Sequence, residues 1–439
     1  MEAFVAALNY AIPIFLLLIL LEMLYGYFRG KTTYVAMDTI SSLSSGITNI
    51  VKTVLGLVIS IIAYDWLVDR IGLFDIKATW WAFVLAFVGK DFAGYWIHRM
   101  EHRINVFWNR HIVHHSSEEF NLACALRQSI SEIFSYTALF LLPLALLGVP
   151  AEVYAITAPL HLFAQFWYHT RLIDRMGWLE KVIVTPSHHR VHHAINARYL
   201  DKNFSQIFIV WDKLFGTFQE ELAEELPVYG VKRAVSTWNP ILINFQHLWQ
   251  IISDAWRARS YRDKLRIWWM PTGWRPADVA QRYPVSFTED PYTQVKYGPP
   301  ASVWLKIWSA LQLVITLTLA LYLFNRLPDI PVWQSFLYGG FLFLSVYAYT
   351  TLMDYQKQAL WLEILKSTFG LGLLYGLGDW FLLQQAFPEG VWLLTGYFCL
   401  SPLVVAIFVR LELPHRYGVS GDANLDELYL KARQPLQKL

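Results

Sequence analysis

The sequence is short of charge and of cysteine. Only 16% of its 439 residues are charged, and the two cysteines, Cys124 and Cys399, lie far apart in apolar stretches. Typical soluble domains carry about 25% charged residues, so this composition argues against a soluble protein. Two distant cysteines exclude a disulfide framework. A net charge of +2 provides no basic field for nucleic acid, so we expect no nucleic-acid partner.

Long apolar runs are present instead. A spanning helix needs about 20 mainly apolar residues to cross a hydrocarbon layer about 30 Å thick. The sequence predicts single spans at residues 4–28, 47–67, 79–96, 303–324, 332–349, 359–387 and 391–409. A further run, 133–169, is broken by Gly148 and Pro150, and it predicts either a hairpin of two segments or a re-entrant segment.

Basic residues beside the spans indicate the orientation, because Lys and Arg in short flanks favour the cytoplasmic side. Arg29 and Lys31 follow the first span, and Arg410 and Arg416 follow the last. The middle of the chain is therefore predicted on the cytoplasmic face, of the inner membrane in a bacterium or of the endoplasmic reticulum in a eukaryote. Two aromatic, amphipathic stretches there, 241–256 and 261–269, suit either the headgroup layer or a domain surface.

Histidine is the residue that clusters. Three motifs stand out, and His169 lies between the second and the third: His98-Arg-Met-Glu-His102, His111-Ile-Val-His114-His115 and His188-His189-Arg-Val-His192-His193. Residues four apart share one face of a helix, so each motif can aim two imidazoles at one metal ion. A lone histidine is usually a satisfied core residue. Packing alone rarely produces three such motifs, because a buried imidazole without a partner costs free energy.

The histidines are too numerous for one zinc ion, which takes four ligands, and they predict two metal ions. The predicted ligands are His98, His102, His111, His114, His115, His169, His189, His192 and His193, with His188 as a tenth candidate. The same residues except His169 and His188 are predicted to be catalytic. Soluble di-iron bundles use mainly Glu and Glu-x-x-His, so an all-histidine set with few carboxylates differs from them.

The chemistry that such a pair supports has alternatives. Two iron ions that activate O₂ against an unactivated lipid C–H bond are the leading interpretation. Hydrolysis by two zinc ions stays open, because Glu101, Glu118 and Glu119 could supply a carboxylate base. A membrane metal transporter is the remote alternative, although transport sites lie near the midplane of the bilayer and these motifs gather at one face.

Other residues are predicted around the metals. Imidazoles that bind metal usually donate their second N–H to a carboxylate or carbonyl, and the candidates for that contact are Asp91, Glu101 and Asn121. The residues predicted to contact a lipid substrate or a cofactor are Glu118, Arg127, Gln128, Phe166 and Trp167. Aromatic residues near a membrane boundary, including Trp80 and Trp81, either line a cavity or form an interfacial belt.

The motifs resemble those of the fatty acid hydroxylase and sterol desaturase superfamily of membrane di-iron enzymes. Residues 111–129, HIVHHSSEEFNLACALRQS, and 185–219, TPSHHRVHHAINARYLDKNFSQIFIVWDKLFGTFQ, are similar to its alkylglycerol monooxygenase branch. The resemblance implies two iron ions, for which zinc can substitute in a purified sample, and O₂. It implies hydroxylation of the carbon next to an ether oxygen, giving a fatty aldehyde and a glycerol derivative. Sterol, carotenoid or acyl-lipid hydroxylation or desaturation is the alternative within the superfamily.

The resemblance also implies an external electron donor. The branch uses tetrahydrobiopterin, and other branches use electron-transfer proteins. Arg103 departs from the branch, whose animal members are expected to carry an acidic residue there.

The predicted fold is an all-α polytopic membrane protein in which a cytoplasmic, helical, histidine-rich di-metal domain caps the transmembrane helices. Five parts are predicted: N-terminal anchors (1–78), a catalytic core (79–220), an amphipathic cytoplasmic or interfacial segment (221–300), a C-terminal membrane block (301–415) and a cytoplasmic tail (416–439).

Overall fold

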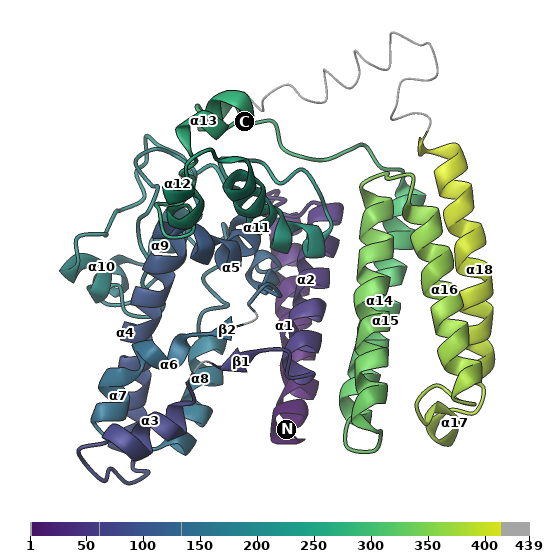
Figure 1. Ribbon diagram of the computed structural model, residues 1–439, viewed down its shortest axis with the longest axis horizontal. Coiled ribbons are helices and arrows are strands. Elements are labelled where there is room, and N and C mark those ends of the chain that lie inside the picture. Colours follow the sequence, from purple (N-terminus) through teal and green to yellow (C-terminus); the bar gives the residue numbers. More distant parts are fainter. Residues whose placement is uncertain (1, 61, 133, 414–439) are drawn as a thin grey trace.

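The computed structural model describes residues 2–60, 62–132 and 134–413; its regular structure is mainly helical, with one pair of two-residue strands among the described residues (Figure 1). The predicted tail, 416–439, lies outside the described residues. The chain forms three regions in Figure 1: a long N-terminal helix pair, a histidine-bearing half on one side, and a C-terminal bundle on the other. An all-α polytopic fold is thereby confirmed.

Four helices of the described chain are long and apolar enough to cross a bilayer. They are residues Leu8–Phe28 of α1 (Glu2–Phe28), α14 (Val303–Arg326), α15 (Val332–Met353) and α18 (Gly390–Leu411). Each coincides with a predicted span. The predicted span at 359–387 is shorter in the structure: α16 (Ala359–Gly376) ends early, and the short helix α17 (Leu383–Ala386) follows it.

The predicted span at 47–67 has the wrong bounds. Helix α2 (Ala36–Val54) begins earlier and ends at Val54, and the chain then turns through Gly56, whose φ is +65°, into β1 (Ile59–Ser60). The first half of α2 is rich in serine and carries Asp38, yet these side chains are buried. They face α14, α15 and the short helix η1 (Cys124–Leu126) rather than lipid. Helix α2 buries polar side chains against other helices, so its bounds do not follow the apolar run in the sequence.

The apolar run 133–169 forms no spanning helix among its described residues. It contains β2 (Phe134–Ser135), α6 (Thr137–Phe140), α7 (Leu142–Leu146) and α8 (Ala151–Phe163). At 1.5 Å per residue, the 13 residues of α8 reach about 20 Å, which is too short to cross. Gly148 is needed at the break: its φ is +75°, and a Cβ there would lie 1.8 Å from the Phe74 carbonyl oxygen. The re-entrant alternative therefore fits better than two full spans.

The histidine-bearing half is built on two consecutive helices. Helix α4 (Trp80–Arg103) begins with Trp80 and Trp81, which stack on each other and are 62% and 64% exposed. Their exposure favours the belt interpretation for these two residues. Helix α4 reaches its histidines in its last two turns, and after Ile104 the chain continues as α5 (Asn105–His115).

A helical cap closes this half. Its elements are η2 (Gly177–Lys181), α9 (Pro186–His192), α10 (Val210–Leu214), α11 (Pro240–Arg257), α12 (Tyr261–Arg266), α13 (Ala277–Arg282) and η3 (Pro291–Thr293). Helices α11, α12 and α13 lie at the end of the molecule where α1 ends and α14 begins (Figure 1). A short helix, α3 (Tyr64–Ile71), lies at the opposite end with α7. Strands β1 and β2 pair in parallel, Ile59 opposite Phe134.

Candidate metal centre

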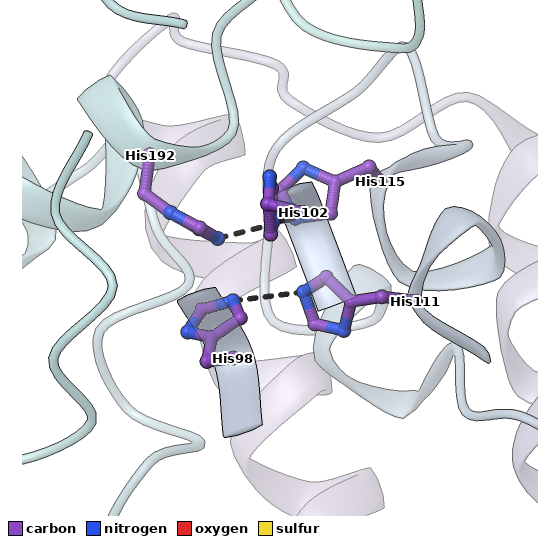
Figure 2. A group of neighbouring side chains, drawn as sticks. All are labelled: His98, His102, His111, His115 and His192. Atoms are coloured by element: carbon purple, nitrogen blue, oxygen red, sulfur yellow. Dashed lines mark hydrogen bonds between the residues drawn. The ribbon is translucent and has the colours of Figure 1, made fainter. Parts of the chain in front are cut away.

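The structure brings nine histidines into two adjoining groups. The first group is His98, His102, His111, His115 and His192 (Figure 2). The second is His114, His169, His189 and His193. Within each group, one ring nitrogen of every residue lies within 4.8 Å of those of the others. These are the nine residues predicted as ligands, and they come from α4, α5, the segment after α8, and α9 with the residue that follows it, His193.

The Nε2 atoms are spaced as ligands of one ion would be. In the first group, the Nε2–Nε2 distances are 2.9 Å for His98 and His111, 3.2 Å for His102 and His115, and 3.1 Å for His192 and His115. In the second group, three such distances lie between 2.9 and 3.3 Å. Two nitrogens about 2.1 Å from one ion lie about 3.0 Å apart at a right angle and about 3.4 Å apart at a tetrahedral angle. The donor set therefore fits two metal ions.

Backbone carbonyls orient several of these rings. His98 Nδ1 lies 2.7 Å from the Phe204 carbonyl oxygen, and His192 Nδ1 lies 2.9 Å from that of Lys202. His169 Nδ1 is 3.1 Å from the Gln165 carbonyl oxygen. A carbonyl accepts only from a protonated Nδ1, so these contacts assign the lone pair to Nε2, which faces the group.

Burial keeps the imidazoles neutral. Desolvation lowers the pKa of His98 to about 3 and that of His169 to about 4, because a charged imidazolium loses its hydration. The pKa of His115 is also lowered well below its usual value, first by desolvation and then by its neighbour His193. Neutral imidazole is the form that binds a metal ion, so the site is prepared for metal at neutral pH.

Two carboxylates contact the first group. Glu101 Oε2 lies 3.4 Å from His111 Nδ1, and Glu101 also pairs with Arg110 at 3.0 Å. Desolvation raises the pKa of Glu101 to about 7. Asp201 was missed by the sequence analysis: its Oδ1 lies 3.8 Å from His102 Nδ1, and it pairs with Arg103 at 3.2 Å. Its φ of +57° places it in a turn, within the stretch 185–219 on which the family resemblance rests.

Arg103, where an acidic residue is expected in the animal members of the branch, pairs with an acidic residue in the structure. Arg103 neutralises Asp201, the carboxylate beside His102. A basic residue at this position therefore sets the charge next to the first histidine group.

Three residues predicted at or beside the metals, Asp91, Asn121 and His188, have other contacts in the structure. Asp91 contacts His161 at 2.8 Å, and this histidine belongs to neither group. Asn121 donates to the Thr33 carbonyl oxygen at 2.7 Å and accepts from the Ala123 amide, so it supports a turn. His188 forms the capping box of α9 with Thr185. It points away from the groups because neighbouring helical residues differ by about 100° in direction.

The residues predicted to contact substrate or cofactor also have other partners. Arg127 is 2% exposed and pairs with Asp38 of α2 at 2.6 Å, so its side chain joins two helices. Gln128 donates to the Ala125 carbonyl oxygen. Glu118 accepts from the Tyr297 amide and from Gln294.

The two predicted aromatic contacts are packed within the protein. Phe166 packs on Phe15 of α1, with ring centroids 4.5 Å apart. Trp167 packs with Tyr168 against Val184 and Ile209. Their contacts are with the protein core rather than with the cavity that adjoins the histidines.

That cavity lies between α5 and the cap. Its volume is about 380 Å³, and its wall includes His102, His115, His192 and His193. Other parts of the wall come from Arg103, α5, α11, Val285, Phe287 and the segments 194–201, 230–233 and 267–275. None of the five residues predicted for substrate or cofactor lines it. The cavity mixes apolar side chains with charged ones, so an amphiphilic ligand fits it.

Known proteins are similar to this chain over most of its length. The family model for fatty acid hydroxylase matches residues 83–217, the segment that holds all nine histidines. The chain is 33% identical over 372 residues to alkylglycerol monooxygenase of Homo sapiens, covering 84% of this chain and 82% of that protein. It is 34% identical over 373 residues to that of Danio rerio, covering 82% and 80%. Ornithine lipid hydroxylase of Rhizobium tropici is 30% identical over 135 residues, 31% of this chain and 41% of that protein. No solved structure matches.

The helical membrane fold and the paired histidine groups thus define an integral membrane oxidoreductase of the fatty acid hydroxylase class. Within that class the chain belongs to the alkylglycerol monooxygenase family, and it is a lipid monooxygenase.

Proposed function

We propose that the protein is a di-iron monooxygenase that cleaves the ether bond of alkylglycerol lipids. One atom of O₂ enters the C–H bond next to the ether oxygen. The other leaves as water, with two electrons and two protons from an external donor. The hydroxylated carbon is then a hemiacetal, which collapses to a fatty aldehyde and the free glycerol hydroxyl. The two inward-facing histidine groups are the observation that supports this proposal most strongly.

Iron suits this donor set. Imidazole is a good ligand for iron, and the groups of five and four histidines would hold one ion each. When bound, the iron pair supplies the activation of O₂. The chain's own contribution is to keep the imidazoles neutral and oriented: carbonyls of Phe204 and Lys202 fix two rings, and Glu101 supports a third.

The surroundings also suit a substrate held by a membrane. All nine histidines are buried or half-buried, which limits the access of water. The cavity against the first group provides room for a polar headgroup, while apolar residues such as Ile112 and Ile267 line its wall. Ligand sites of this kind are mainly apolar with a few orienting polar groups.

The proposal puts the centre on the cytoplasmic face. Arg29 and Lys31 follow α1, and Arg410 lies in the last turn of α18. These helix ends lie on the side of the cap in Figure 1, and flanking basic residues favour the cytoplasm. Electrons come from an outside donor, for which we propose tetrahydrobiopterin. An electron-transfer protein is the alternative donor.

The test is turnover with a defined lipid. Purified protein loaded anaerobically with ferrous iron is given 1-O-hexadecylglycerol, O₂ and either tetrahydrobiopterin or a ferredoxin system. We expect hexadecanal with at least one donor, and none from monopalmitoylglycerol, which has an ester in place of the ether. A fully iron-loaded protein that produces no aldehyde with either donor would refute the ether-cleaving function. A product hydroxylated elsewhere on the chain would favour an acyl-lipid hydroxylase.

A further inference from the structure

The cavity beside the histidines carries excess positive charge. Its wall includes four basic residues, Arg103, Lys232, Arg233 and Arg275, and two acidic ones, Asp201 and Asp254. Arg103 pairs with Asp201 at 3.2 Å, and Arg275 pairs with Asp254 at 2.6 Å. Both carboxylates are thus used by these two arginines.

The other two basic residues of the wall are Lys232 and Arg233. Neither forms an ion pair with an acidic residue in the part of the chain that the structure describes. Both side chains are partly buried and line the cavity. Desolvation, and then the nearby Arg275, lower the pKa of Arg233, which means that its positive charge lacks full compensation. An anion in the cavity would supply it.

The segment that carries these two cations is held firmly. Val231 and Val235 belong to a buried apolar cluster with Ile112 and Val113 of α5. The Lys232 carbonyl oxygen accepts from the Thr288 amide at 2.8 Å. Two cations on a fixed segment are pre-organised for a ligand, which reduces the entropy lost on binding.

The same segment lies close to the histidine centre. Trp108 packs against the Val231 cluster, and its ring centroid is 5.0 Å from that of His102 and 5.5 Å from that of His115. Lys232 and Arg233 line the same cavity of about 380 Å³ as three histidines of the first group, His102, His115 and His192. A ligand that reaches both must carry its anionic group a short distance from its reacting carbon.

A phosphorylated ether lipid has this form, because only the glycerol carbons separate its ether oxygen from its phosphate. We propose that Lys232 and Arg233 form a subsite for the phosphoryl group of a 1-O-alkylglycerol 3-phosphate, whose ether carbon faces the histidines. Arginine and lysine are the side chains that usually bind phosphate. This inference rests on the proposed function and names its preferred substrate.

The experiment measures binding alone. Iron-loaded protein in nanodiscs of neutral lipid is titrated, without O₂ or donor, with 1-O-octylglycerol and with its 3-phosphate. We expect the phosphate to bind about tenfold more tightly, the equivalent of one charged hydrogen bond. The double variant Lys232→Gln/Arg233→Gln should lose this preference but bind the neutral lipid normally, which also shows that it is folded. Arg233→Lys should keep most of the preference, and Arg262→Gln, an exposed control outside the cavity wall, should keep all of it.

Three results would overturn the proposal: no preference for phosphate in the native protein, a preference that survives the double substitution, or glycerol 3-phosphate and inorganic phosphate binding as tightly as the lipid. The last result would assign the subsite to a soluble phosphate compound. Failure of the ether-cleaving function is distinguishable, because the subsite would then still bind the phosphate lipid through Lys232 and Arg233 while no aldehyde forms from either lipid.

Discussion

The imidazole of His161 lies 2.8 Å from Asp91 (Nε2 to Oδ1), and neither side chain is exposed to solvent. Asp91 also accepts from the Ile207 amide at 2.8 Å and from the Trp211 indole at 2.8 Å. One buried carboxylate thus joins α4, α8 and the segment that leads into α10. Asp91 holds the segment that begins at Ile207, three residues after Phe204. The Phe204 carbonyl orients His98, so Asp91 helps to position the metal centre without contacting it.

Substitution of Asp91 by alanine should destabilise the protein and loosen the metal centre. Asp91 is the acceptor for several buried N–H groups, and each buried donor left without a partner costs about 1–3 kcal/mol. We expect a lower thermal unfolding temperature in detergent and reduced iron content. Asp75→Ala is the control, because Asp75 and its partner Lys77 are mostly exposed and such pairs contribute little. Equal stability of the two variants would contradict a supporting role for Asp91.

The histidine centre was predictable because its signal is local. Imidazoles at i and i+4 share a helical face, so His98 with His102 and His189 with His193 could be paired from spacing alone. Spans such as α14 and α18 were predictable for a similar reason, since lipid-facing helices are apolar along their whole length. These features need no knowledge of the rest of the fold.

The missed features depend on partners that are distant in the sequence. The sequence predicts that Arg127 contacts substrate or cofactor, but in the structure it pairs with Asp38, which is 89 positions away in the sequence. Helix α2 hides polar residues such as Ser44, which contacts Tyr349 of α15. The cavity wall is assembled from segments between His102 and Phe287, and no spacing rule brings such segments together.

Substitution of His192 by alanine should abolish turnover and lower iron content while the protein stays folded. His192 contributes Nε2 to the first group, 3.1 Å from that of His115, whereas the helices are held by many other contacts. His188→Ala is a matched control from the same motif, because His188 caps α9 and lies outside both groups. We expect it to keep its iron. Iron per protein, measured by mass spectrometry, checks both variants, and equal iron loss would show that the motif was assigned incorrectly.

Glu101→Gln should weaken metal binding without removing a ligand. Glu101 lies against His111 Nδ1 at 3.4 Å, and loss of such a partner typically costs 10–100-fold in metal affinity or activity. Glu132→Gln is the control, since Glu132 shares the same partner, Arg110, at 3.1 Å. Competition with a chelator measures the affinity of each variant. Comparable affinities for the two variants would show that Glu101 acts only through Arg110.

Acid should release the metals and destabilise the protein over one range of pH. The pKa of His98 is about 3 and that of His169 about 4 in the folded chain, whereas an unfolded histidine titrates near about 6.5. Because the folded values are the lower ones, the unfolded state takes up protons first as the pH falls. The stability that is fully present above about pH 6.5 is therefore lost progressively as the pH falls toward 3–4. Metal is lost over the same range, because its ligands must be unprotonated.

Thermal unfolding of chelator-treated protein between pH 8 and pH 4 measures the loss of stability. The unfolding temperature of His98→Gln should depend less steeply on pH than that of the native chain. An unfolding temperature that stays constant across this range in the metal-free protein would contradict neutral, buried histidines as the source of its stability.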